Sequence, residues 1–370
     1  MLVDIEIGEN YDFFAANEKD FYNNFSHSST LCQGKHWKKP PLVTVLVTTY
    51  KRPELLSRAL DSALNQKGFS DYQILIADNE GRPIEEETPT SRVVEKYQNE
   101  RIIYYRHSEE TVYKMDSAVR LAKSPWIVFL HDDDLLAENH LALMTDVIKK
   151  HKEIKFLACD AKIVNSEKEI KENQNINSQN YKIYKYSKDA LCLGNNPAFL
   201  GALISRKHYI AIGGIPTINT GIGDTILTGS FLHHFGLYIY TGGKPLYLYC
   251  KGEQQGTCLY ASDSRVRANE YLFYKYVINK YHKLTHKIWE RNIAYELFAF
   301  FKSYYEDDIY KGNVDLESII SECGLPSNIL KKGVRYYITR SFFFLYGGCR
   351  RRLTNTYREK IKKSDVYIII

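Results

Sequence analysis

The sequence predicts an α/β protein with an open, mostly parallel sheet, and three observations lead to this fold class. Apolar, β-branched segments alternate four times with segments of helical spacing over about ninety residues. Polar residues directly follow several of these strand segments, where a parallel sheet presents the carboxyl ends of its strands. The 370 residues are also enough for one large domain and an appendage. The polar residues after the strands are therefore the first candidates for a ligand site.

The first strand and helix are the most clearly marked elements. LVTVLVTT (42–49) is almost wholly apolar, as expected of a strand that is buried on both faces. Pro53 stands at the start of a helix whose leucines and alanines repeat at helical spacing as far as Leu64. The alternation continues with the strand YQILIAD (72–78), a helix around 91–99, the strand RIIYY (101–105), a helix around 112–123 and the strand PWIVFL (125–130).

The second half of the chain is less regular. NHLALMTDVIKKH (139–151) predicts a helix and KFLACDAKIV (155–164) a strand, and the polar segment 165–180 predicts a hairpin or loop. From about residue 265, aromatic and charged residues mix at helical spacing. We therefore divide the chain into an N-terminal extension (1–40), a main domain (41–262) and a helical C-terminal region with a basic tail (263–370).

The composition is that of an ordinary globular protein, with 44% hydrophobic and 25% charged residues, and it excludes collagen-like, disordered and disulfide-scaffold classes. No apolar run reaches the length of about 18 residues that a membrane-spanning helix needs. The first ten residues carry acids where a secretory signal has Lys or Arg, and the seven cysteines form no CxxC pair. We therefore expect a cytoplasmic protein with reduced thiols.

Positive charge gathers at the end of the chain. Residues 331–370 contain 11 Lys and Arg against 2 Asp and Glu, although the net charge of the whole chain is only +6. Together with the apolar clusters SFFFLY and VYIII, this basic tail is compatible with docking on an anionic membrane surface. A solvated final helix explains the same pattern equally well. Nucleic acid is a weaker interpretation, because no base-reading motif accompanies the charge.

Three adjacent carboxylates, Asp132, Asp133 and Asp134, directly follow the strand PWIVFL. Adjacent negative charges repel one another unless a cation lies between them. Oxygen ligands suit Mg²⁺ or Mn²⁺, which bind through one or two carboxylates and a substrate diphosphate. The alternative is that Asp134 only caps the next helix while the other two carboxylates are solvated.

The ends of the first two strands carry groups that suit a nucleoside. Tyr50 can stack on a pyrimidine, and Asp78 can accept a hydrogen bond from a ring N–H, with Thr48 and Thr49 beside them. Each of these residues alone is ordinary for a turn. The sequence has no GxxxxGK[ST] motif and no GxGxxG after a strand, so P-loop and Rossmann dinucleotide sites lose their main support.

Five segments, in this order, resemble the family 2 glycosyltransferases with the GT-A fold, over about residues 42–260. VTVLVTTYKRPELLSRALDSALNQ resembles the family's opening strand and nucleotide turn, YQILIADN its base-binding strand, and IVFLHDDD its metal-binding strand. NNPAFLGALISRKHY resembles the stretch that shapes the acceptor side. GIGDTILTGSFLHHF resembles the motif that supplies the catalytic base.

The resemblance implies that the protein transfers a sugar from a nucleotide sugar with inversion of configuration. The expected sugar is a hexose or N-acetylhexosamine, and the expected nucleotide is UDP. The resemblance also implies a role for each matching residue. Its nucleotide-binding residues are Thr48, Thr49, Tyr50, Arg52, Asp78 and Asp133, its Mn²⁺ or Mg²⁺ ligands are Asp133 and Asp134, its general base is Asp224, and its acceptor side includes Asn196, His233 and His234. The implied acceptor is a glycan or lipid-linked saccharide, used at the inner membrane face to build a surface polysaccharide such as a capsule. The oligomeric state stays open.

The sequence departs from the family pattern at three places. His131 stands where the family commonly has the first Asp of the metal motif, and we expect it to line the pocket rather than bind the metal. Cys250 and Gly252 replace an Arg and a His, and Lys244 or Lys251 are possible substitutes for that contact. In the helix before the metal strand, the family's Arg-Asn pair is absent, and Lys114, Asp116 and Arg120 stand there.

Two other functions compete with a glycosyltransferase. A sugar nucleotidyltransferase has a related fold, but it needs a glycine-rich loop after the first strand, where this chain has TTYKRP. A glycan-binding protein on the same fold does not need the acidic motifs, yet Asp224 and the Asp133–Asp134 pair are present. Asp224 also suits the N-cap of a helix, a role that is compatible with catalysis.

Overall fold

The computed structural model describes residues 11–16, 18–23, 28–110, 114–174, 181–192, 196–215, 222–241, 243–250 and 264–281. The basic tail 331–370 lies outside these residues, as do Lys251 and Gly252, so the predictions made for them rest on the sequence.

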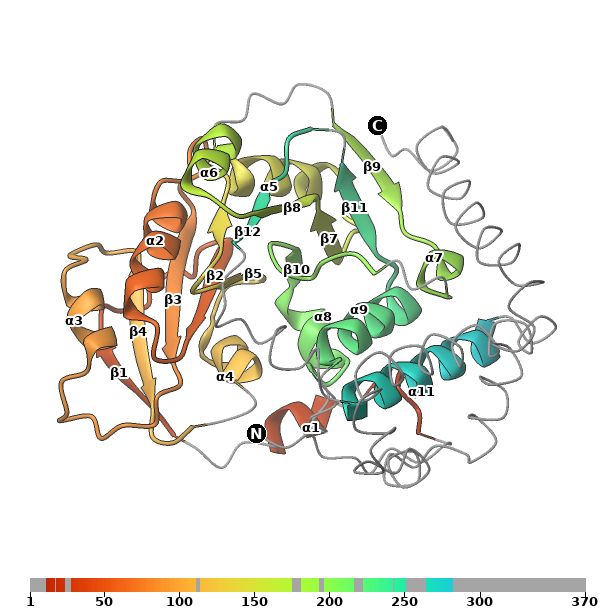
Figure 1. The fold of residues 1–370 in the computed structure, drawn as a ribbon, viewed down its shortest axis with the longest axis horizontal. Coiled ribbons are helices and arrows are strands. Elements are labelled where there is room, and N and C mark those ends of the chain that lie inside the picture. The colour runs from red at the N-terminus through yellow and green to blue at the C-terminus, as the bar shows by residue number, and fades with distance from the viewer. Residues whose placement is uncertain are drawn as a thin grey trace, which may run out of the picture.

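A nine-stranded sheet forms the centre of the protein, in the order β1-β4-β3-β2-β5-β10-β7-β11-β9 (Figure 1). The strands β4, β3, β2, β5, β7 and β11 run in one direction, and β1, β10 and β9 run against them. The predicted mostly parallel sheet is therefore confirmed. The strands are β1 (Ser29–Gln33), β2 (Val43–Thr49), β3 (Tyr72–Asp78), β4 (Ile102–His107), β5 (Trp126–His131), β7 (Phe156–Cys159), β9 (Lys182–Lys185), β10 (Leu203–Ser205) and β11 (Tyr238–Thr241).

A small second sheet pairs β6 (Leu135–Leu136), β12 (Tyr247–Cys250) and β8 (Ala161–Val164) in the order β6-β12-β8. The single strand predicted for 155–164 is wrong, because the chain leaves the large sheet at Asp160 and continues as β8. The Asp160 carbonyl accepts a hydrogen bond from the backbone N–H of Leu246 (3.0 Å), and its carboxylate accepts one from the Thr241 hydroxyl. The pairing of β12 with β6 then places β12 beside the residues that follow β5.

The described helices are α1 (Glu18–Asn23), α2 (Pro53–Leu64), α3 (Pro89–Glu95), α4 (Lys114–Leu121), α5 (His140–Lys150), α6 (Glu167–Gln174), α7 (Lys188–Cys192), α8 (Arg206–Ala211), α9 (Gly223–His234) and α11 (Ser264–Tyr281). The loop or hairpin predicted for 165–180 is wrong over α6. The Ser166 hydroxyl accepts a hydrogen bond from the backbone N–H of Glu169, as an N-cap does. The buried Ile170 then anchors this polar helix to Leu135 and Leu248 of the small sheet.

The two faces of the large sheet build two apolar cores, because successive side chains of a strand point to opposite faces. Val128 of β5 belongs to the core on the face that α2 and α5 cover. Phe129 belongs to the other core, which includes residues of α4, α8, α9 and α11. The N-terminal extension also contributes to the large sheet and to this second core. β1 pairs with β4, and Phe13 and Phe14 are buried against α11.

None of the helices in the described ranges combines the length and the apolar character needed to cross a lipid bilayer.

Candidate functional site

The carboxyl ends of β2, β3 and β5 meet at one edge of the large sheet. Thr48 of β2 lies opposite His131 of β5, and Thr49 lies opposite Asp78 of β3. Thr48, Thr49 and Asp78 are all buried. The turn after β5 begins at His131, whose carbonyl accepts a hydrogen bond from the backbone N–H of Asp134 (3.2 Å). The sequence prediction that these residues gather at one edge is correct.

The three aspartates after β5 are nearly inaccessible to solvent. Asp132 is 4% exposed, Asp133 7% and Asp134 0%. A solvated arrangement of Asp132 and Asp133 is therefore excluded. Asp134 is also not a helix cap, because residues 135 and 136 form β6 and the next helix begins at His140. Burying three carboxylates is unfavourable unless each has hydrogen-bonding or charged partners, so these partners define the site.

Asp134 is held by the small sheet. The Tyr247 hydroxyl donates to Oδ2 (2.6 Å), and the backbone N–H of Cys250 donates to Oδ1 (2.8 Å). Burial raises the pKa of Asp134 to about 7, and the neighbouring aspartates add to the increase while the two hydrogen bonds oppose it. Tyr247 and Cys250 were not predicted as site residues. Both lie in the apolar segment PLYLYC (245–250), but nothing in that segment indicates its partner.

Arg52 supplies positive charge to the other two aspartates. Its Nη1 lies 3.0 Å from Asp133 Oδ2 and 3.5 Å from Asp132 Oδ1. The backbone N–H of Tyr50 also donates to Asp132 Oδ2 (3.3 Å). Burial nevertheless raises the pKa of Asp132. Arg52, predicted from the family resemblance as a nucleotide contact, is bonded in this structure to the carboxylates of the metal motif.

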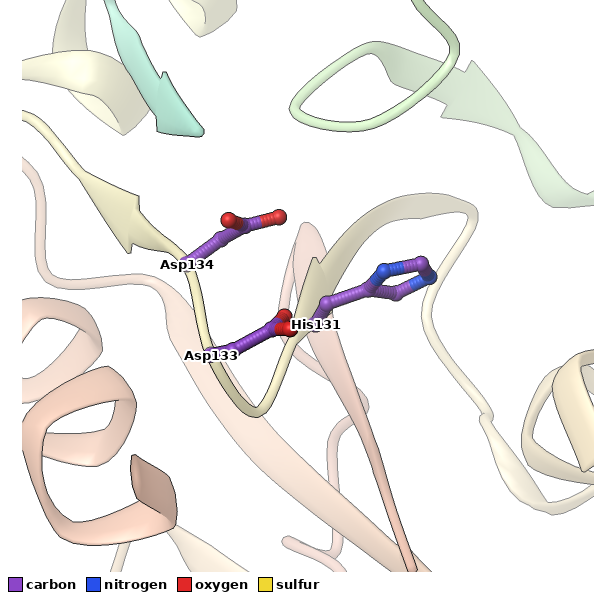
Figure 2. A group of neighbouring side chains, drawn as sticks. All are labelled: His131, Asp133 and Asp134. Atoms are coloured by element: carbon purple, nitrogen blue, oxygen red, sulfur yellow. The ribbon is translucent and has the colours of Figure 1, made fainter. Parts of the chain in front are cut away.

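His131 belongs to the same cluster. One ligand atom each from His131, Asp133 and Asp134 lies within 4.8 Å of the other two, and Figure 2 shows all three side chains leaving one turn toward the same side. An imidazole nitrogen and two carboxylate oxygens are a donor set that first-row divalent metals accept. A divalent ion therefore fits these residues. The expectation that His131 only lines the pocket took no account of this proximity.

At the end of β3, Asp78 is buried and bonded by the protein itself. The Tyr104 hydroxyl donates to Oδ2 (2.6 Å), and the backbone N–H of Glu80 donates to Oδ1 (3.0 Å). Burial raises the pKa of Asp78 despite these bonds. The carboxylate is thus fixed in direction at the end of β3. Tyr104 was not identified from the sequence, because an interior Tyr of a strand is ordinary there.

Tyr50 has its ring at the surface of this edge. Its hydroxyl donates to Glu110 Oε1 (2.7 Å), and the Lys51 ammonium donates to both the Tyr50 hydroxyl (2.8 Å) and Glu110 (3.0 Å). Lys51 has a φ of 56°, a left-handed conformation that is uncommon for a residue with a Cβ. This turn carries the backbone from β2 to α2 past Asp132.

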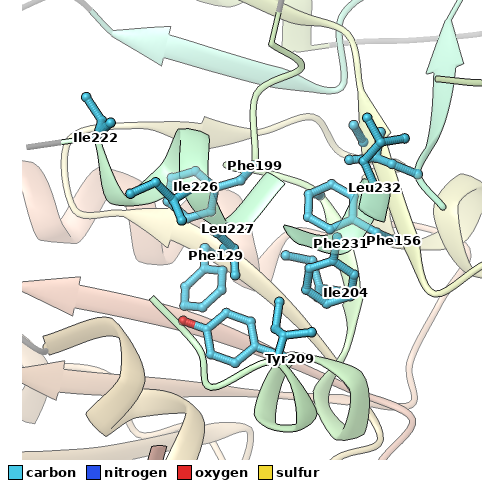
Figure 3. Close-up of a cluster of buried hydrophobic side chains, with 14 of the residues drawn as sticks. Phe129, Phe156, Phe199, Ile204, Tyr209, Ile222, Ile226, Leu227, Phe231 and Leu232 are labelled. Carbon is cyan, nitrogen blue, oxygen red and sulfur yellow. The ribbon is translucent and has the colours of Figure 1, made fainter. Parts of the chain in front are cut away.

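Asp224 stands in the first turn of α9 and is exposed. Its Oδ1 accepts a hydrogen bond from the backbone N–H of Thr225 (2.8 Å). The helix itself is anchored, because Ile226 and Leu227 lie beside Phe129 of β5 in the second core (Figure 3). The rigid part of α9 thus begins two residues after the carboxylate.

The predicted acceptor-side residues lie at opposite ends of α9. Asn196 donates through Nδ2 to the Tyr274 hydroxyl of α11 (2.9 Å) and to the Thr225 hydroxyl (3.4 Å), so it lies next to Asp224. His233 and His234 lie about 14 Å along the helix axis from Asp224, at a rise of about 1.5 Å per residue.

The two histidines bind the N-terminal extension. His233 stacks on Phe14 with ring centroids 5.1 Å apart, and its Nδ1 lies 2.7 Å from the Tyr281 hydroxyl. His234 Nε2 donates to the Phe14 carbonyl (2.7 Å). Burial lowers the pKa of His233 to about 4. In this structure both histidines hold Phe14 against α9, and the structure does not bring them together with Asp224.

Asp116 of α4 is a buried carboxylate on the α9 side of the sheet. It accepts hydrogen bonds from the Tyr209 hydroxyl and from the backbone N–H of Ile215 (3.2 Å). Burial raises the pKa of Asp116 to about 7. Gly214 passes so close that an added Cβ would lie 2.5 Å from Asp116 Oδ1. Asp116 therefore fixes the turn at 213–215 and is not accessible to a substrate.

Residues 44–213 match the family model described as glycosyl transferase family 2. Comparison with curated protein sequences found no significant match.

Solved structures of S. aureus TarS share the fold. The crystal structure of S. aureus TarS 1–349 in complex with UDP-GlcNAc is similar with a TM-score of 0.55 and 15% identity, over 82% of this chain and 92% of that chain. TarS 1–349 in complex with UDP gives a TM-score of 0.54 and 14% identity, over 82% of this chain and 91% of that chain. At this identity the likeness establishes the fold, which is the predicted GT-A fold.

Proposed function

We propose that this protein is an inverting glycosyltransferase that moves a sugar from a UDP-sugar to a hydroxyl of a glycan or lipid-linked acceptor. Its residues 44–213 match the family 2 glycosyltransferase model. The observation that carries the proposal is the turn after β5. Its three buried aspartates, two of them bonded to Arg52, lie at the edge where Thr49 and Asp78 end their strands. Such an edge of an open α/β sheet is where ligands bind.

The donor half of the proposed site lies along this edge. Asp78 accepts from the ring N–H of the base, the Tyr50 ring stacks on it, and Thr48 and Thr49 contribute to the wall of the nucleoside site. Asp133 and Asp134 hold Mn²⁺ or Mg²⁺, which, when bound, stabilises the negative charge of the departing diphosphate. Arg52, already bonded to Asp132 and Asp133, adds a fixed positive charge beside the diphosphate.

Asp224 is the proposed general base. It takes the proton of the acceptor hydroxyl as that oxygen bonds to the anomeric carbon, while the bond from the anomeric carbon to the diphosphate breaks and UDP leaves. Attack on the face opposite the leaving group inverts the configuration. A sugar hydroxyl is a weak nucleophile, and a positioned base contributes about 10² to 10⁴ in rate. The exposure of Asp224 and its place beside Asn196 support a role on the acceptor side.

The donor proposal also draws on the solved structures that share this fold. S. aureus TarS, which has this fold at 15% identity, has been solved with UDP-GlcNAc, so UDP-GlcNAc is the first donor to test. A screen of nucleotide sugars for hydrolysis, with and without Mn²⁺ or Mg²⁺, tests the proposal on the full chain. We expect one UDP-sugar to be hydrolysed only with metal. Hydrolysis of none of the sugars, together with no thermal stabilisation by any nucleotide, would reject it.

We also propose a cytoplasmic location at an anionic membrane surface. Cys159, Cys192 and Cys250 are buried free thiols, as in a reducing compartment. The docking part rests on the basic tail 331–370 alone, where each nearby cation contributes on the order of 1 kcal/mol. The full-length protein should sediment with phosphatidylglycerol vesicles and be released as salt rises. Equal sedimentation of a chain that ends at residue 330 would contradict docking through the tail.

A further inference from the structure

We propose that His131 is a ligand of the divalent ion, together with Asp133 and Asp134, and that its imidazole makes the site prefer Mn²⁺ over Mg²⁺. The proposal rests on the proposed function, since a metal-dependent donor site is its premise. It assigns to this histidine a direct role in the choice of metal.

The backbone brings the three side chains to one side of the turn. Side chains alternate along a strand, so His131, the last residue of β5, lies on the same face as Phe129, whose ring packs against Phe199. The hydrogen bond from the Asp134 N–H to the His131 carbonyl then folds the chain into a tight turn. This turn returns Asp133 and Asp134 to the side on which the imidazole lies (Figure 2).

The distances between the three candidate ligand atoms suit one ion. Two atoms that bind one Mg²⁺-sized ion at about 2.1 Å are at most about 4.2 Å apart. The three candidate ligand atoms lie within 4.8 Å of one another, so rotations that move each atom by under about 1 Å bring them to one ion. His131 is half-buried, and Asp133 and Asp134 are buried, so the three atoms gather in a partly enclosed place.

The net charge of the aspartates and Arg52 suits one divalent cation. Asp132, Asp133 and Asp134 carry three negative charges when ionised, and the Arg52 guanidinium, which bonds to the first two, offsets one. The hydrogen-bond donors on Asp134, the Tyr247 phenol and the Cys250 N–H, are neutral. The remaining charge of about −2 matches one divalent cation.

The metal preference follows from the ligand chemistry. Mg²⁺ is bound by oxygen ligands and water, whereas imidazole nitrogen suits transition metals and affinity rises from Mn²⁺ along the first row. An Asp at position 131 would add a further oxygen donor and negative charge, which favours Mg²⁺. Replacing Asp by His therefore shifts the site toward Mn²⁺ without removing a donor.

Electron spin echo spectroscopy of bound Mn²⁺ tests the ligand directly, since an imidazole nitrogen on Mn²⁺ produces a ¹⁴N modulation. The full-length protein is measured with Mn²⁺ alone and with Mn²⁺ plus UDP. We expect the modulation in the wild type, its loss in His131→Asp and His131→Ala, and its retention in His151→Gln, a control at the end of α5. Modulation that persists in His131→Ala, or that the wild type lacks, would overturn the proposal.

Metal titration calorimetry tests the preference. Loss of a hydrogen-bond partner of a metal ligand lowers metal affinity about 10- to 100-fold, and exchange of the ligand itself should have at least as large an effect. Because the carboxylate introduced in His131→Asp favours Mg²⁺, the ratio of the Mn²⁺ affinity to the Mg²⁺ affinity should fall at least about tenfold. An unchanged ratio would overturn the preference.

The two proposals fail separately. A nitrogen ligand on Mn²⁺ in a protein that hydrolyses no nucleotide sugar rejects the proposed function alone, and turnover without that ligand rejects this inference alone.

Discussion

The turn after β5 and the first turn of α9 carry the two kinds of carboxylate that the proposed reaction needs, and they are built differently. Asp132, Asp133 and Asp134 are buried and receive bonds from β12 and from Tyr50 and Arg52 in the turn after β2. Asp224 is exposed, and its Oδ1 accepts from the next residue's backbone N–H. The donor half is therefore positioned by the sheet before a substrate arrives. We infer that changes there affect binding, whereas a change at Asp224 affects turnover.

The largest effect is expected for Asp134→Asn, which should abolish transfer, as should EDTA. The substitution removes a negative ligand from the metal site. The fold should survive, because the Asn oxygen can accept from the Cys250 N–H while its amide donates to the Tyr247 oxygen. Transfer assays with circular dichroism check both parts. Full transfer in EDTA would contradict the metal requirement, and restoration of activity by added Mn²⁺ is the control.

Asp224→Ala should lower kcat by at least about 10², because the lost carboxylate acts on the acceptor in the transition state. The measurement is steady-state transfer at saturating donor, with thermal denaturation as the check on folding. Since Asp224 is exposed, the melting temperature should stay close to that of the wild type. A variant that transfers at the wild-type rate would place the base elsewhere.

Gly201→Ala should damage the donor half indirectly. Gly201 has a φ of 72°, and an added Cβ would lie 2.5 Å from the Tyr247 ring, which holds Asp134. The strain should cost about 1–3 kcal/mol in the free energy of unfolding and should also weaken UDP binding. Gly68→Ala is the matched control, with a φ of 74° and only the Ala142 Cβ near its added Cβ, at 3.3 Å.

Denaturant unfolding separates the two glycine variants. Both should lose stability, and only Gly201→Ala should lose UDP affinity. Equal UDP affinity in the two variants would contradict the positioning of Asp134 by Tyr247.

A further prediction concerns the pH dependence of stability and Asp116, the buried carboxylate on the α9 side of the sheet. Burial raises its pKa in the folded state to about 7, above the ordinary value near 3.8, so the unfolded chain releases this proton first as pH rises. The contribution of Asp116 to the free energy of unfolding should therefore fall between pH 4 and 7, by at most about 1.4 kcal/mol per pH unit. Asp116→Asn should flatten the stability profile over this range. A profile equally steep in the variant would contradict it.

The sequence predicted those features whose cause is local. Apolar β-branched runs identified β2, β3 and β5, and the three aspartates stood out because they follow a buried strand. The supports of these groups could not be predicted, since Tyr247 is distant in sequence from Asp134 and only the register of β12 against β6 brings them together. Helix α6 was missed because a single apolar residue, Ile170, anchors it. The role of His131 depends on a turn whose direction no pattern encodes.

Calorimetric titration of UDP in the presence of Mn²⁺ tests the difference between the two halves most directly. Asp134→Asn and Asp224→Ala each remove one carboxylate charge, one from the turn after β5 and one from α9. We expect Asp134→Asn to lose at least about tenfold in UDP affinity, because a ligand of the metal is changed, and Asp224→Ala to bind UDP as the wild type does. Equal losses in the two variants, or wild-type affinity in Asp134→Asn, would contradict a donor half that is built by the sheet and separate from the base.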